Sequence, residues 1–163
     1  MKIKKQIKIK GMGLVEILIV LAVVAVGFLS ILSFLIFSRG VTFQAARNTK
    51  VTALAEEGIE AVRSMRDESW AANVSVLASG TTYYPVISSG KWSLSAINPG
   101  LIDNLYTRTI VVSNVSRDAN DNISASGTND PNTKKVVATV TWQESGRSKS
   151  VVLTTYITNF LDN

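Results

Sequence analysis

The 163 residues include no cysteine and no histidine. Disulfide bridges, thiolate nucleophiles, zinc sites of cysteine and histidine, and imidazole acid–base catalysis are therefore excluded. The sequence also contains no serine nucleophile elbow, phosphate-binding loop or dinucleotide fingerprint. Carboxylates alone can support catalysis, but no catalytic constellation of them is evident. We therefore expect a protein that is not an enzyme and that carries no cofactor.

Charge of one sign is in excess only at the N-terminus. The chain has 17 lysines and arginines against 12 acidic residues, and five of the lysines lie within residues 1–11. Beyond that segment the basic and acidic side chains balance, and no basic stripe is interleaved with aromatic residues. The pI near 9.6 thus reflects a short basic tail, and we predict no nucleic-acid binding by the folded part.

Helix-breaking residues are also scarce, because the first of only three prolines is Pro85. Residues 14–37 are apolar apart from Glu16, two serines and a glycine. As a helix this run is about 36 Å long, enough to cross a hydrocarbon core of about 30 Å. The lysines before the run predict a cytoplasmic N-terminus and an extracytoplasmic remainder in a single-pass membrane protein.

A carboxylate just inside a membrane-length helix is costly, by about 2.5–3.5 kcal/mol at mid-bilayer and less near the interface. Glu16 therefore needs a partner, or else lies at the headgroup level of an uncleaved signal anchor. The apolar run is too long for an ordinary secretory signal, and no small-x-small cleavage site follows it. The best candidate for a proteolytic cleavage site is Gly11, on the cytoplasmic side. Cleavage there would leave the membrane helix on the product.

Together these features resemble a prepilin signal. A lysine-rich leader, Gly11, the apolar Met12, Glu16 and an unbroken Ile/Leu/Val run occur in the type and order found in bacterial type IV prepilins and in the pseudopilins of type II secretion and competence systems. Many members carry Phe and then Thr after the cut, whereas this chain has Met12 and Gly13.

The resemblance implies specific roles and partners. A membrane prepilin peptidase would cleave between Gly11 and Met12 and methylate the new amine of Met12. Glu16 would pair with that amine on a neighbouring subunit during assembly. The other partners implied are further pilin or pseudopilin subunits, packed helix to helix, and an inner-membrane assembly platform. The product would be a cell-surface or periplasm-spanning filament; pilus, secretion and competence systems all remain open.

The amphipathic pattern continues past the membrane segment. Apolar residues recur at three- and four-residue spacing and form one stripe along a helix. The stripe consists of Val51, Leu54, Ala55, Gly58, Ile59, Val62 and Met65. One helix is thus predicted from about residue 12 to residue 67, about 80 Å long, which the remaining residues cannot enclose. Its second half must pack on the rest of the chain.

After Trp70 the pattern changes to the period of two that is typical of strands. Strands are predicted at residues 106–115, 135–143 and 149–157, the last two joined as a hairpin, and a shorter hairpin at 81–88 and 91–95. The final hairpin resembles that of V-type minor pilins and I-type minor pseudopilins. The absence of cysteine, which closes a C-terminal loop in many major pilins, favours a minor subunit.

The predicted fold is therefore α+β, with a long N-terminal helix packed on an antiparallel sheet in a pilin-like lollipop. Its segments are a cleaved leader (residues 1–11), a transmembrane and assembly half of the helix (12–38), an amphipathic half (39–68) and a β head domain (69–163).

Two alternatives remain open. Asp118, Asn120 and Asn122 offer oxygen ligands at alternate positions, a weak calcium candidate that lacks the glycine and glutamate of an EF-hand loop. A solvated loop reaching Pro131 is the other interpretation of that segment. The chain as a whole could instead be a membrane-tethered extracytoplasmic binding or adhesion module that does not polymerise.

Overall fold

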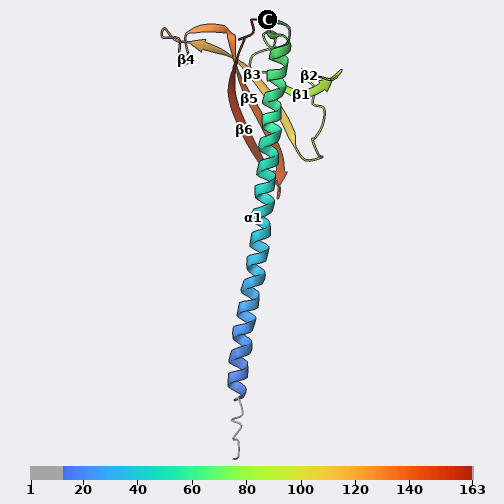
Figure 1. Cartoon of the computed structure of the whole chain (residues 1–163), viewed down its shortest axis with the longest axis vertical. Helices are drawn as coiled ribbons and strands as arrows, with labels where there is room; N and C mark the ends of the chain where they lie inside the picture. Colours follow the sequence, from blue (N-terminus) through green and yellow to red (C-terminus); the bar gives the residue numbers. More distant parts are fainter. Residues whose placement is uncertain (1–12, 163) are drawn as a thin grey trace, which may run out of the picture. The chain divides into compact units, whose positions relative to one another are not determined.

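The computed structural model describes residues 13–162. It divides between Ala46 and Arg47 into an N-terminal unit and a C-terminal unit, which ends at Asn163. The main helix, α1, runs from Leu14 to Glu68 (Figure 1). The elements after it are α2 (Trp70–Asn73), β1 (Thr82–Ser88), β2 (Lys91–Ser95), β3 (Thr107–Arg117), β4 (Ile123–Ser124), β5 (Thr128–Glu144) and β6 (Arg147–Thr158). The predicted α+β class is confirmed: a 55-residue N-terminal helix packs, through its C-terminal part, on a six-stranded antiparallel sheet.

The strand order is β2-β1-β3-β5-β6, with β4 paired to β3. Both predicted hairpins are present, and each closes with two residues at positive φ. These are Ser89 and Gly90 between β1 and β2, and Ser145 and Gly146 between β5 and β6. Two-residue turns of this kind match the right-handed twist of the strands that they join, so they fix the hairpin register.

The segment before Pro131 is not simply the solvated loop that the sequence suggested. It contains β4, and β5 begins at Thr128. The reason is a bulge in the β3–β5 ladder: Asn114 pairs with Lys134, but Val115 pairs with Asp130. Pro131 falls within this irregularity, where its missing N–H removes no ladder hydrogen bond. The short helix α2 was also not foreseen.

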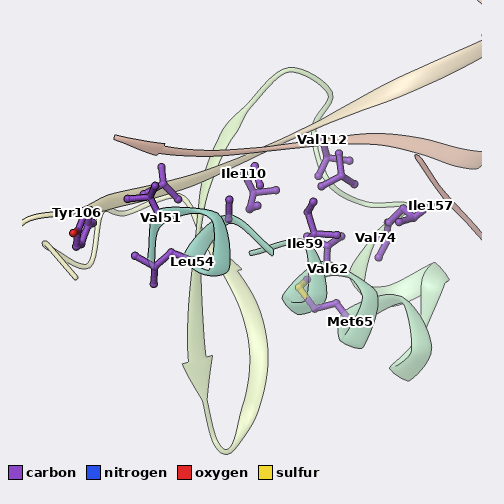
Figure 2. Close-up of a cluster of buried hydrophobic side chains, with 14 of the residues drawn as sticks. Val51, Leu54, Ile59, Val62, Met65, Val74, Tyr106, Ile110, Val112 and Ile157 are labelled. Carbon is purple, nitrogen blue, oxygen red and sulfur yellow. The ribbon is translucent and has the colours of Figure 1, made fainter. Parts of the chain in front are cut away.

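The core of the C-terminal unit lies between α1 and one face of the sheet. All seven residues of the predicted α1 stripe are buried, together with Ala61. Their partners on the sheet alternate along each strand, as a half-buried sheet requires. The strand residues in this apolar cluster are Ile110 and Val112 of β3, Val136, Ala138, Val140 and Trp142 of β5, and Ile157 of β6. Figure 2 shows Val51 and Leu54 near Tyr106, and Ile59 and Val62 opposite Ile110 and Val112.

A charged side chain is also buried in this layer. Arg108 has 7% of its surface exposed, and its Nη1 lies 2.8 Å from Glu57 Oε2 and donates to the Leu54 carbonyl oxygen at 3.1 Å. Its guanidinium also lies over the Trp92 ring, 5.7 Å from the centroid. The absence of a side chain at Gly58 makes room, since a Cβ there would lie 3.1 Å from both Arg108 Cδ and Ile110 Cδ1.

We predict that Gly58→Val lowers the free energy of unfolding of the C-terminal unit by about 1–3 kcal/mol, the usual cost of overpacking. Gly40→Val is the matched control, because a Cβ at Gly40 meets nothing within 4 Å. Chemical denaturation of the full chain in detergent micelles, followed by tryptophan fluorescence, measures the difference. Equal stability of the two variants would show that α1 does not approach β3 at Gly58.

Candidate functional site

The candidate functional site is the surface of α1 within the N-terminal unit. Every residue from 13 to 46 is exposed in the isolated chain. The exposed residues include large apolar side chains on all sides of the helix; Leu14, Val15, Phe34 and Ile36, for example, expose 67–75% of their surface. The most apolar 18-residue window has a mean hydropathy of 2.9, so by length and composition the helix can cross a membrane.

A helix that is apolar all round is stable only when another apolar phase covers it, either lipid or other helices. The C-terminal part of α1, in contrast, carries one apolar stripe and is covered by the sheet. The same continuous helix therefore changes from an all-round apolar surface to a one-sided one. The exposed apolar surface indicates insertion in a membrane or packing against other helices.

Glu16 is the one acidic residue in the first turn of α1. The helix begins with hydrogen bonds from the Glu16 and Ile17 backbone N–H groups to the Gly13 carbonyl oxygen, at 2.8 and 3.3 Å. A carboxylate in this turn interacts favourably with the positive end of the helix dipole. Among residues 13–162 the Glu16 side chain has no ion-pair or hydrogen-bond partner. Its role in assembly stays a prediction.

The other two predicted site residues, Gly11 and Met12, lie outside the described residues, as do the lysines of the leader. Cleavage between them and methylation of Met12 therefore stay predictions. The boundaries predicted for the leader, the two halves of the helix and the head domain are likewise untested.

At the candidate calcium loop, the Asp118 carboxylate is used within the loop itself. One of its oxygens accepts hydrogen bonds from the backbone N–H groups of Asn120 and Asn122, at 2.8 and 2.9 Å. These two bonds, with Asn122 contributing most, lower the pKa of Asp118. Within residues 13–162 no three acidic side chains are grouped to hold a metal ion. Calcium binding through Asp118, Asn120 and Asn122 stays a prediction.

Arg117, beside this loop, ties the β3–β4 turn to β5. Its Nε lies 2.6 Å from Asp130 Oδ2, and its Nη1 donates to the Asp121 carbonyl oxygen at 2.8 Å. The pKa of Asp130 is lowered, first by the Thr133 hydroxyl and then by the Arg117 guanidinium, both of which hydrogen-bond the ionised carboxylate. The loop is thus held by charge-assisted hydrogen bonds on its β5 side.

Sequence reasoning missed the interactions of Arg108 with α1. The structure pairs the buried Arg108 with Glu57, whose side chain is 48% exposed on α1. A signal was present, since Arg108 alternates in phase with Ile110 and Val112 and so occupies an inward-facing position of β3. A charged residue in the apolar phase of a strand indicates a partner on the element that covers it.

Comparison with protein-family models, with curated proteins and with solved structures finds no match to this chain. The long apolar N-terminal helix, packed through its C-terminal part on an antiparallel sheet, is consistent with a pilin-like fold. The architecture and the residues themselves therefore carry the functional interpretation.

We predict that Asp130→Asn reduces stability above pH 4 and that the deficit disappears in acid. A lowered pKa in the folded state means that the ionised carboxylate stabilises the fold above its unfolded pKa of about 3.9. This stabilisation is lost as the pH falls through the lower folded pKa. Urea unfolding between pH 2 and 6 measures the difference, with Glu56→Gln as the control for removal of one exposed carboxylate. A deficit that does not vary with pH would contradict the ion-pair role of Asp130.

Proposed function

We propose that this chain is a structural subunit of a bacterial filament, a minor pilin or pseudopilin of a type IV pilus or a type II secretion-like system. It is made as a single-pass protein of the cytoplasmic membrane, with the C-terminal unit outside. Prepilin peptidase removes residues 1–11, and the product assembles through its N-terminal helix. The role is structural, without catalysis or a cofactor.

One observation carries the proposal: the helix from Leu14 to Phe37 is exposed and, apart from Glu16, apolar on all sides. In a secreted globular protein such a segment would expose apolar surface to water. In a filament subunit the same surface contacts lipid before assembly and neighbouring helices after it. The serines and glycine within the run are small enough to allow close helix packing.

Glu16 adds a carboxylate to this apolar surface, which a simple membrane anchor does not require. Cleavage after Gly11 would create a positive amine at Met12, four residues before Glu16 in the sequence. On a staggered neighbour, that amine is a suitable partner for Glu16 in an apolar environment. The pairing would set the axial position of one helix against the next.

We predict that the mature protein begins at Met12 and that the new amine is methylated. In cells that contain the peptidase, Gly11→Val should leave the full-length chain in the membrane, because the residue before the cut is no longer a glycine. Gly13→Val is the matched control and should still be processed. Intact-mass spectrometry of the membrane fraction distinguishes these species. Residues 1–11 on protein taken from assembled fibres would refute the proposal and favour a tethered binding module.

We predict that Glu16→Leu inserts in the membrane at least as well as wild type but enters filaments poorly. Losing one partner of a buried ion pair costs about 3 kcal/mol, equivalent to on the order of 100-fold in incorporation. Glu16→Gln, which keeps the size of the side chain but not its charge, should fail similarly. Quantitative mass spectrometry of sheared filaments counts the variant per subunit, so rescue by other pilins is visible. Wild-type incorporation of both variants would exclude charge pairing.

A further inference from the structure

The C-terminal unit has a concave polar site on the face of the sheet that α1 does not cover. Its cavity, of about 460 Å³, is lined by β3, β4, β5 and β6. This volume lies within the range of about 300–1,000 Å³ that is typical of small-molecule sites. None of the interactions described above uses this cavity as a binding site.

The floor of the cavity is one row of side chains across three strands. Ser113 of β3 pairs with Lys135 of β5, which pairs with Tyr156 of β6. Residues directly opposite in an antiparallel sheet share a face, with Cβ atoms about 4.5–5.5 Å apart. Their chain neighbours Val112, Val136 and Ile157 are buried against α1, so this row points to the opposite side.

The wall of the cavity is a consequence of the β3 bulge. Beyond Asn114, β3 continues to Ser116 and Arg117, which pair with β4. Figure 1 shows β4 at the end of the sheet, apart from the β1–β2 hairpin. Ile123, Ser124 and Ala125 line this side of the cavity, so hydroxyl groups and an apolar side chain both face the ligand space.

Among the described residues that line the cavity, one is charged, and its charge is positive. Within residues 13–162, the Lys135 side chain has no ion-pair or hydrogen-bond partner, and no carboxylate lines the cavity. The neighbouring Lys134 is buried and its Nζ lies 2.6 Å from Asn114 Oδ1. Lys134 pairs across the strands with Asn114 and with Ile157, which is buried against α1, so this hydrogen bond lies on the α1 side of the sheet. Lys135 therefore brings its charge to the cavity alone.

We propose that this cavity binds an acidic saccharide, with Lys135 on the sugar carboxylate. Tyr156, 45% exposed, offers a ring face to the pyranose, and the serine hydroxyls pair with its hydroxyl groups. A single ammonium group suits the single charge of a carboxylate. A phosphate, with nearly twice the charge, is usually held by arginine or by several backbone N–H groups. The proposal does not depend on filament assembly.

The test is calorimetric titration of the unprocessed full chain in a zwitterionic detergent that has no sugar headgroup. The probes are trigalacturonate and sialyllactose, compared with methyl-esterified trigalacturonate and lactose. We expect at least one acidic probe to bind, with a Kd below about 1 mM, and its neutral counterpart not to bind. Lys135→Met should weaken binding at least about tenfold. The matched control Lys149→Met, which removes an exposed lysine of β6 outside the cavity, should leave it unchanged.

Several results would overturn the proposal. One is that neither acidic probe binds, and another is that Lys135→Met and Lys149→Met weaken binding equally, as in non-specific charge attraction. A third is displacement of the saccharide by an equal concentration of inorganic phosphate, which would show that the cavity binds anions in general. Tyr156→Leu, a second variant, should also weaken binding at least several-fold. Full binding by this variant would exclude the sugar ring from the proposed position. Because cleavage and assembly are not measured, these results stand apart from the filament proposal.

Discussion

The C-terminal unit depends on the burial of one apolar stripe of α1 beneath the sheet. Neither surface is stable alone: the helix would expose residues from Val51 to Met65, and the sheet would expose its inward-facing side chains. Burying both surfaces removes them from water together, which is the main favourable term in folding. The period of the stripe and the alternation of the strands are the two sequence patterns that this contact requires.

The ion pair of Arg108 and Glu57 gives this otherwise apolar contact a fixed position. Apolar surfaces can slide past one another at modest cost, but Arg108 must reach both Glu57 and the Leu54 carbonyl oxygen. A shift of α1 by one turn would leave a buried guanidinium without these partners, at a cost of several kcal/mol. Gly58 and Arg108 thus determine where the helix lies on β3, which hydrophobic burial alone does not determine.

Much of this arrangement could be predicted from the sequence. The α1 stripe, the two hairpins and the inward-facing residues of β5 follow from local periodicity and turn residues, and the structure confirms them. The bulge at Asn114 and the early start of β5 could not be predicted, because they depend on which residues of two distant strands pair. The pairing of Arg108 with Glu57 was missed for the same reason.

Part of the candidate site, too, could be predicted from the sequence and part could not. The exposed apolar surface of the N-terminal unit follows from composition alone, so the sequence was sufficient to predict it. The roles predicted for Gly11, Met12 and Glu16 require a peptidase and a second subunit, and one folded chain does not contain these partners. The cavity beside Lys135 was not predicted, because its floor is assembled from three strands and its wall from a bulge.

The contact between α1 and the sheet also has a mechanical consequence. The buried stripe extends along the helix for about 21 Å, from Val51 to Met65. A force applied along the helix axis would load these side-chain contacts in parallel, in shear, so that they must yield together. A force that lifted the helix sideways would break them one turn at a time. The joint between helix and sheet is therefore much stronger in tension along the helix than in peeling.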